Sequence, residues 1–502
     1  MPNYKTIIGL EIHAELNTNS KMFCSCDNKP ENDSPNSTVC PICLGHPGTL
    51  PVPNKKAIEF VIAAGLALNC EINLNSKFDR KNYFYPDLPK GYQISQLDEP
   101  LAFNGYLDID GEKIAITRIH LEEDTGKSSH PKEKDYTLID FNRAGTPLME
   151  LVTDPVIKTS QEAKKFCQKY QQILRYLDIS RADMERGEMR CEANVSLQEE
   201  GKFEYKDKEI KPLKNYKLNS KVEVKNINSF RSLEKAIEFE ITRQKEVLEN
   251  NGEIDAETRG WDDDKNETVS QRIKETSADY RYFPEPDIPP LQIDGKWLAK
   301  IKASLPEMPA NKIIRFTHEY GLSQDMAELL CADKLLANWS EQVISELNAW
   351  IEANGDDAER QDKKLAKTAA NWISSELLKH LKVNKETISD LKLSAENFAE
   401  LVCLIYQGKV NSSAGQTILE YMYKNGGDPT NIMIDMSLEQ IDDRANLEAT
   451  VKKITSNNPE LVEEYKKGKH NIIQFLLGKV MAETKGKANP GIVKEILLSL
   501  LK

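Results

Sequence analysis

The stretch Gly9-Leu-Glu-Ile-His-Ala-Glu-Leu16 alternates apolar and polar side chains. In a β-strand, side chains two residues apart point to the same face. One face then carries Leu10, Ile12, Ala14 and Leu16, and the other carries Glu11, His13 and Glu15. The apolar face predicts a strand packed on a core. Two carboxylates and an imidazole on the polar face suit a hard divalent cation, although a solvated face of a two-sided sheet would show the same pattern.

The rest of the first 295 residues mixes such strands with amphipathic helices. Alternating stretches occur at Lys113–Leu121, Arg190–Leu197 and Lys221–Val224, and helical patterns at Ser160–Leu177 and Ser232–Leu248. Strands and helices do not alternate regularly, so a doubly wound parallel sheet is not expected. The sequence predicts an α+β fold, in which a mixed or antiparallel sheet is backed by helices.

A proline-rich segment, with prolines at 284, 286, 289 and 290, marks a change in the pattern. Strand signals nearly vanish after it, and helical stripes and helix starts such as Asn489-Pro490 take their place. We therefore predict three domains: an α/β cradle at residues 1–295, a helical domain at 296–405 and a small helical tail at 406–502.

The overall charge argues against a chain that simply coats nucleic acid. The 502 residues carry 67 Lys and Arg against 80 Asp and Glu, a net charge of −13. Residues 451–502 alone hold ten Lys and five acidic residues. This basic end could contact a phosphate backbone, or it could be an ordinary solvated surface.

No segment of the sequence is a candidate membrane span. The best apolar run, Phe60–Cys70, has 11 residues, whereas a bilayer requires about 20. The N-terminus enters a strand-like run at once, which leaves no room for a signal peptide. The sequence predicts a soluble, cytoplasmic protein.

A second polar strand, Ile116–Asp124, strengthens the case for a metal site. Strict alternation places four of its side chains on one face: Arg118, His120, Glu122 and Asp124. Glu123 joins them only if the strand ends or bulges there. Glu150 and Glu192 add two further acidic positions. Acidic groups beside His and Arg are typical of phosphoryl transfer, where Mg²⁺ bridges phosphates and a cation stabilises the developing charge.

The segment Thr125-Gly-Lys-Ser128 has only the tail of a P-loop, because position 121 is Leu and not the required Gly. A Walker-A assignment therefore fails. A short turn at Gly126, Lys127 and Ser128 could still bind phosphate through backbone N–H groups. Arg190 and Glu192 complete the predicted cofactor-binding set.

Four of the nine cysteines form a cluster in the sequence, Cys24-x-Cys26 followed by Cys40-x-x-Cys43. This spacing suits a tetrahedral Cys₄ zinc site, and four thiolates without an open position would make it structural. The segment between the pairs is rich in Asn, Ser and Pro and has little core of its own. The alternative is four unrelated reduced thiols.

Aromatic residues alternate with cations in Phe78–Tyr92 and in Tyr280–Asp287. Such side chains can stack unpaired RNA bases and contact phosphates. The predicted RNA contacts here are Arg80, Lys81, Tyr83 and Tyr85. A packed loop with cation–π contacts would give the same composition.

Long motifs carry a resemblance to a known family. They are Ile8–Leu16, Lys77–Pro86, His120–Lys127, Asn142–Glu150, Arg190–Asn194, Lys225–Phe230, Asp279–Asp287 and Lys485–Pro490. With these motifs the chain resembles the B subunits of aspartyl/glutamyl-tRNA amidotransferases over nearly its whole length.

The resemblance implies an enzyme that uses ATP and Mg²⁺ to phosphorylate the side-chain carboxylate of Glu on tRNA-Gln, or of Asp on tRNA-Asn. Ammonia from a partner amidase, the A subunit, then displaces the phosphate, and a C subunit completes a heterotrimer. The resemblance carries the magnesium and catalytic ligands to Glu11, His13, Glu123 and Glu150, and zinc to the four clustered cysteines. It also implies that the tail binds the body of the tRNA. The candidate contact residues there are Lys479, Lys485 and Lys487.

One position departs from the family pattern, since Glu192 stands where many members have Asp. A role for Glu192 at a second metal is therefore left open. Two other functions are compatible with the residues alone: a zinc-stapled RNA-binding protein without catalysis, and a free-standing ligase for a small acid. The sequence does not decide between Glu-tRNA and Asp-tRNA as substrate.

Overall fold

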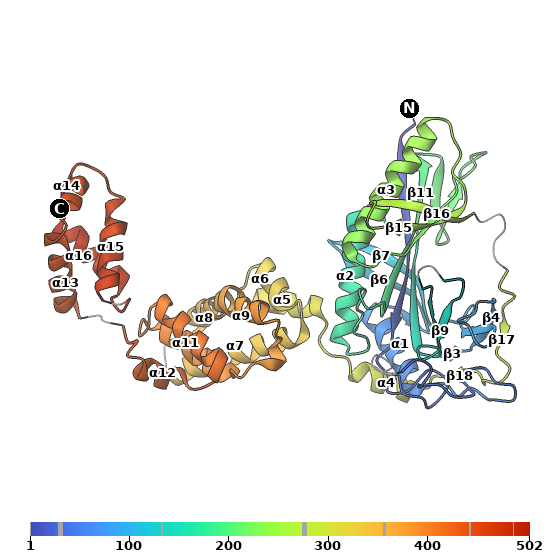
Figure 1. Ribbon diagram of the computed structural model, residues 1–502, viewed down its shortest axis with the longest axis horizontal. Helices are drawn as coiled ribbons and strands as arrows, with labels where there is room; N and C mark the ends of the chain where they lie inside the picture. The colour runs from blue at the N-terminus through green and yellow to red at the C-terminus, as the bar shows by residue number, and fades with distance from the viewer. Residues whose placement is uncertain are drawn as a thin grey trace. The chain divides into compact units, whose positions relative to one another are not determined.

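The structure is a computed structural model that describes residues 2–28, 34–131, 134–273, 279–354, 358–440, 443–484 and 486–501. The chain forms two compact units, Met1–Met308 and Pro309–Lys502. The first unit holds every described strand, and the second is helical (Figure 1). The predicted α+β class is confirmed.

A nine-stranded sheet organises the first unit, in the order β16-β15-β14-β11-β1-β10-β7-β6-β2. Neighbouring strands pair antiparallel, except that β14 and β15 are parallel. Its strands are β1 (Tyr4–Glu15), β2 (Glu71–Ile72), β6 (Ala102–Ile109), β7 (Glu112–Glu123), β10 (Pro147–Thr153), β11 (Met189–Glu199), β14 (Val222–Lys225), β15 (Glu257–Asp262) and β16 (Glu267–Ile273).

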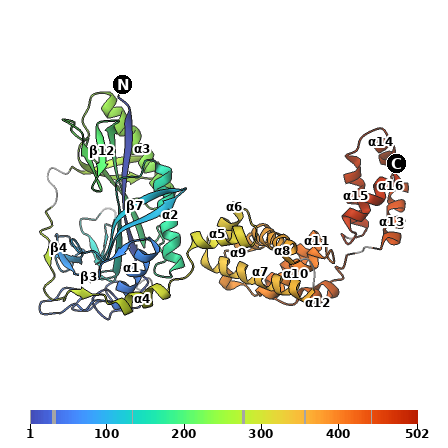
Figure 2. The same ribbon diagram turned by 180° about the vertical axis from the view of Figure 1, so that it is seen from behind.

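Three helices cover one face of this sheet, α1 (Lys55–Ala67), α2 (Ser160–Tyr176) and α3 (Phe230–Glu249). Figures 1 and 2 show α2 and α3 along the same side of the strands. The apolar face of β1 lies in the core with them, because Leu10, Ile12 and Ala14 are at most 1% exposed. The polar face of β1, with Glu11 and His13, therefore points away from the helices.

Small sheets flank this polar face and complete the first unit. They are formed by β17 (Phe283–Pro284) with β4 (Asp79–Asn82) and β5 (Tyr92–Ser95), β18 (Leu291–Gln292) with β3 (Asn75–Ser76), β8 (Lys127–Ser129) with β9 (Leu138–Asp140), and β12 (Phe203–Lys206) with β13 (Glu209–Pro212). Helix α4 (Gly295–Ala303) packs against α1. The compact unit thus extends beyond residue 295, to Met308.

The second unit is built from helices. Their bounds are α5 (Pro309–Glu319), α6 (Gln324–Leu330), α7 (Lys334–Asn354), α8 (Ala358–Trp372), a π-helix (Ile373–Leu377), α9 (Leu378–Asn384), a 3₁₀ turn (Ile388–Asp390), α10 (Ala395–Tyr406), α11 (Ser412–Asn425), α12 (Pro429–Asp435), α13 (Arg444–Ser456), α14 (Pro459–Lys466), α15 (Ile472–Glu483) and α16 (Pro490–Leu500). No helix among the described residues is long and apolar enough to cross a bilayer.

The predicted boundary at 405/406 falls in the last turn of α10, and α10 packs against the next helix, α11. A separate apolar core begins further on and is built from α13, α15 and α16, between Leu447 and Leu501. The start of α16 follows the sequence prediction, since the Asn489 side chain accepts from the N–H groups of Gly491 and Ile492. The helices from about residue 443 onward therefore share an apolar core of their own.

Candidate active site and metal centres

Strand register brings the predicted polar residues into rows across the sheet. In one row His13 on β1 lies opposite Glu150 on β10, and Glu150 lies opposite His120 on β7. The next row pairs Glu192 on β11 with Glu11 on β1. Because all of these side chains share the face turned away from the helices, residues about 140 positions apart in sequence become neighbours.

Three carboxylates and two imidazoles converge at this point. His13 Nε2 lies 3.3 Å from Glu150 Oε2, 3.6 Å from Glu122 Oε1 and 3.9 Å from Glu11 Oε1. His120 Nε2 lies 3.2 Å from Glu150 Oε2 and 3.6 Å from Glu122 Oε2. We call Glu11, His13, His120, Glu122 and Glu150 the carboxylate–imidazole cluster.

Burial and charge shift the pKa values of this cluster strongly. Burial disfavours the charged imidazole of His13, but the hydrogen bond and charge of Glu150 raise its pKa to about 9. Burial likewise opposes ionisation of Glu150, yet His120 and His13 hold the pKa of Glu150 well below its usual range. Without a metal ion, the two imidazoles are therefore the counter-charges of the carboxylates.

The cluster suits a hard divalent cation. One ligand atom from each of Glu11, His13 and Glu150 lies within 4.8 Å of the others, and the same holds for His120, Glu122 and Glu150. Mg²⁺ binds its ligands at about 2.1 Å, so two ligands of one ion are at most about 4.2 Å apart. The contacts of 3.2–3.9 Å in the cluster meet this limit. His120 Nδ1 is buried and has no hydrogen-bond partner among the described residues.

Glu123 is the predicted metal ligand that the structure does not bring to the cluster. Strand β7 continues through Glu123, so the alternation persists and turns this carboxylate away from the cluster. Glu123 instead pairs with the Lys90 ammonium and accepts from the Ile94 N–H at 3.0 Å. Glu122 takes its place, anchored by the Ser95 hydroxyl at 3.0 Å. Of the two adjacent carboxylates, the structure therefore brings Glu122 to the cluster and not Glu123.

A second acidic group adjoins the cluster at Glu11. Ligand atoms of Glu11, Glu192 and Glu223 lie within 4.8 Å of one another. The ammonium of Lys225 lies 2.8 Å from Glu192 and 3.4 Å from Glu223. Glu192 thus lies next to the site, as its strand position indicated, and a lysine balances its charge.

The expected phosphate-binding turn at Gly126, Lys127 and Ser128 is not formed. Lys127–Ser129 is strand β8, which pairs with β9. The Gly126 N–H donates to the Asp87 carbonyl at 2.8 Å and is not free for phosphate. The turn was expected from the likeness to a P-loop tail. The sequence around residues 127–129 does not indicate that this segment pairs with residues 138–140.

Arg190, the other predicted contact of the cofactor, lies on the cluster's face of the sheet, where it pairs with His13 across the strands. Its guanidinium contacts the Asp124 carboxylate. Arg143 approaches the same carboxylate, with Nε 3.6 Å from Oδ2. The Nε of Arg190 is buried and has no partner among the described residues. The two cations Arg190 and Arg143 therefore surround the Asp124 carboxylate at the border of the cluster.

The aromatic segment that contains β4 and β5 holds a cation that is already paired and aromatic rings that are exposed. Arg80 binds Glu285 with two hydrogen bonds of 2.7 and 2.8 Å and lies over Tyr92, so its charge is already paired. Tyr85 is 58% exposed and Phe84 is 77% exposed. For Arg80, the packed-loop alternative fits better than a phosphate contact.

Two carboxylates of the cluster, Glu122 and Glu150, act electrostatically on the Lys81 ammonium. This ammonium lies 5.8 Å from the ring of Tyr83 and 5.3 Å from the ring of Tyr280. Burial opposes its charge, but Glu122 and Glu150 raise its pKa far above the usual value. Tyr83 itself donates to Gln93 Oε1 at 3.3 Å. Neither Lys81 nor Tyr83 is an open stacking surface.

The four clustered cysteines form a second candidate metal centre. Their sulfur atoms all lie within 4.8 Å of one another. Cys43 Sγ is 3.8 Å from Cys40 Sγ, which is about the edge of a tetrahedron with Zn–S bonds of 2.3 Å. A hydrogen bond from Cys24 lowers the pKa of Cys43 to about 4, against burial and with help from the Cys40 N–H and the charge of Lys21.

The cysteine segment docks on the loop that leads into β10. The Met22 N–H donates to the Gly145 carbonyl at 2.7 Å, and the Thr38 N–H donates to Asn142 Oδ1 at 2.8 Å. Since β10 carries Glu150, the fold of this segment supports the position of a cluster residue.

Two of the three predicted tail lysines lie among the described residues. Lys479 is half-buried on α15, with its ammonium 5.4 Å from the ring of Phe475. Lys487 is half-buried just before α16. Lys485 lies outside the described residues.

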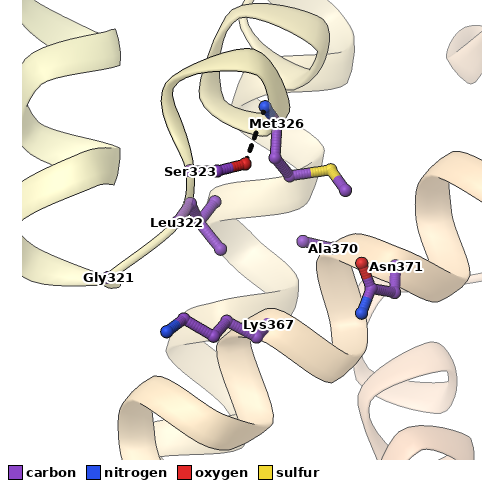
Figure 3. Close-up of a pocket in the computed structure, with 7 residues that line it drawn as sticks. All are labelled: Gly321, Leu322, Ser323, Met326, Lys367, Ala370 and Asn371. Atoms are coloured by element: carbon purple, nitrogen blue, oxygen red, sulfur yellow. Dashed lines mark hydrogen bonds between the residues drawn. The ribbon is translucent and has the colours of Figure 1, made fainter.

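A separate pocket of about 330 Å³ lies in the second unit, between α6 and α8 (Figure 3). It is lined by Gly321, Leu322, Ser323, Met326, Lys367, Ala370 and Asn371. None of the predicted site residues contributes to it.

Comparison with known proteins identifies the family. Residues 6–299 match the model described as the GatB/GatE catalytic domain, and residues 356–501 match the GatB domain. A protein of Carboxydothermus hydrogenoformans is 44% identical over 99% of this chain and 98% of its own, and one of Dehalococcoides mccartyi is 45% identical over the full length of both. Each is named as the B subunit of an aspartyl/glutamyl-tRNA(Asn/Gln) amidotransferase. The chain belongs to the family of B subunits of aspartyl/glutamyl-tRNA(Asn/Gln) amidotransferases.

Proposed function

We propose that this chain is the catalytic B subunit of a cytoplasmic tRNA-dependent amidotransferase. It uses ATP and Mg²⁺ to phosphorylate the side-chain carboxylate of Glu on tRNA-Gln, or of Asp on tRNA-Asn, or of both. It then forms the amide with ammonia supplied by its glutaminase partner, the A subunit, and a C subunit completes the heterotrimer. The observation that carries the proposal is the carboxylate–imidazole cluster, in a chain that matches this family over its whole length.

Activation by phosphate is a chemical necessity for this reaction. An ionised carboxylate is a poor electrophile, and ammonia cannot displace an oxide from it. Transfer of the γ-phosphoryl group to a carboxylate oxygen makes an acyl phosphate, from which phosphate leaves when ammonia attacks the carbonyl carbon. The enzyme must therefore position two anions together and neutralise their charge.

The residues of the cluster fit these tasks. Glu11, His13, Glu122 and Glu150 would hold Mg²⁺, and the ion would neutralise negative charge that develops during phosphoryl transfer. Lys81 and Arg118 add positive charge at the same face, where Arg118 Nη2 lies 3.7 Å from Glu150 Oε1. These cations would orient the incoming carboxylate and the phosphate.

Zinc at Cys24, Cys26, Cys40 and Cys43 would be structural in this proposal. The four sulfur atoms leave no open coordination position for substrate. The ion would hold the cysteine segment in the form that docks on the loop before β10. Contacts to tRNA would come from the exposed ring of Tyr85 near the site and from Lys479 and Lys487 in the tail.

The test is an amidation assay with the reconstituted complex and each mischarged tRNA. The A and C subunits, glutamine and ATP·Mg²⁺ are supplied, and both amide on the tRNA and phosphate from ATP are measured. We expect one phosphate released per amide formed. Phosphate release without tRNA would favour a small-acid ligase. Binding of tRNA with neither product would favour an RNA-binding protein without catalysis.

A further inference from the structure

Lys21 is the least exposed lysine among the described residues of the first unit, with 1% of its surface accessible. Its ammonium donates to the Thr38 carbonyl at 2.8 Å and lies 3.9 Å from Cys43 Sγ. Its own backbone N–H donates to the Cys26 carbonyl at 3.0 Å. Both the side chain and the backbone of Lys21 therefore contact the cysteine segment.

No carboxylate within ion-pair distance balances this charge among the described residues. The nearby Lys90 is different, because its ammonium is paired with Glu123. A buried ammonium with only a carbonyl and a sulfur as partners is costly unless those partners carry negative charge. Among the described residues, the one acidic group that the Lys21 ammonium contacts is the Cys43 thiol, since the Glu123 carboxylate in the same region is paired with Lys90.

A tetrathiolate zinc centre supplies that charge. Four thiolates and one Zn²⁺ carry a net charge of −2, and burial of such a centre is unfavourable without a counter-ion. We propose that Lys21 is the buried counter-ion of the zinc centre, and that its fixed charge stabilises the Zn²⁺-bound tetrathiolate through Cys43. This inference rests on the proposed zinc site, and it assigns to Lys21 a positioning and charge-balancing role.

The experiment measures zinc in the purified chain and the rate at which a chromogenic chelator removes it. The variants are Lys21→Met, which keeps the length but not the charge, and Lys21→Arg, which keeps the charge. Residues that support metal ligands typically change affinity by about 10 to 100-fold when replaced. We expect Lys21→Met to lose zinc at least about tenfold faster, and Lys21→Arg to remain close to the parent chain.

Lys312→Met is the matched control, because Lys312 is also a buried lysine, at 5% exposure. Its ammonium binds Asn338 and Glu341, in the second unit. It should release zinc at the parent rate. Equal rates for Lys21→Met and the parent would overturn the counter-ion role and leave the zinc site standing. A parent chain that purifies without zinc would overturn both.

A variant that fails to fold still decides the question. Lys21→Gln keeps a donor for the Thr38 carbonyl and lacks the charge. If the neutral variants at position 21 do not fold in excess zinc while Lys21→Arg does, charge and not packing is required, as proposed. If Lys21→Arg also fails, Lys21 fills space only and the proposal is wrong.

Discussion

The two candidate metal centres of this protein are assembled in opposite ways. The cysteine centre takes its four ligands from a segment of twenty residues, 24–43. The carboxylate–imidazole cluster takes its residues from β1, β7 and β10, between positions 11 and 150. A local centre is defined by spacing alone, whereas a centre on a sheet depends on the register of each strand. The difference teaches which functional residues a sequence can reveal.

The largest expected effect is loss of catalysis when the shared carboxylate of the cluster is removed. Glu150 contacts both imidazoles, and we predict that Glu150→Ala lowers amide formation on tRNA by about 100-fold or more, since developing phosphoryl charge is no longer neutralised. Ammonia production from glutamine by the complex should continue. Amidation at the parent rate would remove Glu150 from the site.

A substitution in the cysteine centre should change the zinc content of the chain and not the catalytic step. Cys40→Ser should reduce bound zinc from about one ion per chain to near zero, because a three-ligand site holds the ion weakly. Thermal unfolding should begin earlier, since metal binding contributes to folding. Metal analysis of the purified variant checks the first point, and an unchanged zinc content would contradict it. Cys331→Ser, at a buried thiol of the second unit, is the control.

The charge balance within the carboxylate–imidazole cluster predicts a pH dependence of stability without added magnesium. The pKa of His13 is raised to about 9, against about 6.5 in an unfolded chain. The stabilisation is therefore fully present below about pH 6.5 and is lost as the pH rises through about 9. We predict that His13→Gln costs on the order of 2 kcal/mol at pH 6 and much less at pH 10. Thermal unfolding at both pH values measures this difference, and equal costs would contradict it.

The smallest expected effect concerns the tail. Lys479→Glu and Lys487→Glu should raise the KM for tRNA severalfold and reduce the salt slope by about one per lost phosphate contact, without a large change in kcat. Lys424→Glu, on α11, is the control for an added negative charge, since Lys424 is paired with Glu420. An unchanged KM and salt slope would make the tail lysines ordinary surface residues.

Alternation in the sequence predicted most of the fold around the site. The strands expected at Gly9–Leu16 and Lys113–Leu121 belong to β1 and β7, and the helix expected at Ser160–Leu177 is α2. Each has a strong local pattern, because one face packs on a core. Strand β1 pairs with β10 and β11, which are far from it in the sequence, and no local pattern predicts this pairing.

The same limit explains why the sequence did not decide between Glu122 and Glu123. The sequence allowed Glu122 on the cluster's face by alternation and Glu123 only through a bulge, and the resemblance favoured Glu123. The structure has no irregularity at that end of β7, because the register shift lies at Val152 and Thr153, opposite its other half. Alternation alone places Glu122 and His120 on the cluster's face, where the structure also has them.

The boundary near residue 405 between the helical domains stays a prediction for a related reason. Residue 405 lies in the last turn of α10, and α10 packs against α11. Which of many amphipathic helices share a core depends on contacts between them, and the core of Leu447–Leu501 becomes visible only in three dimensions.

Binding of Mn²⁺, a spectroscopic substitute for Mg²⁺, to Glu122→Gln and Glu123→Gln tests most directly whether strand register sets the metal site. The two residues are adjacent, both are buried, and only Glu122 contacts the imidazoles of the cluster. We predict that Glu122→Gln weakens Mn²⁺ binding by roughly tenfold or more, while Glu123→Gln binds as the parent chain does. Loss of Mn²⁺ binding in Glu123→Gln with retention in Glu122→Gln would contradict the assignment of Glu122.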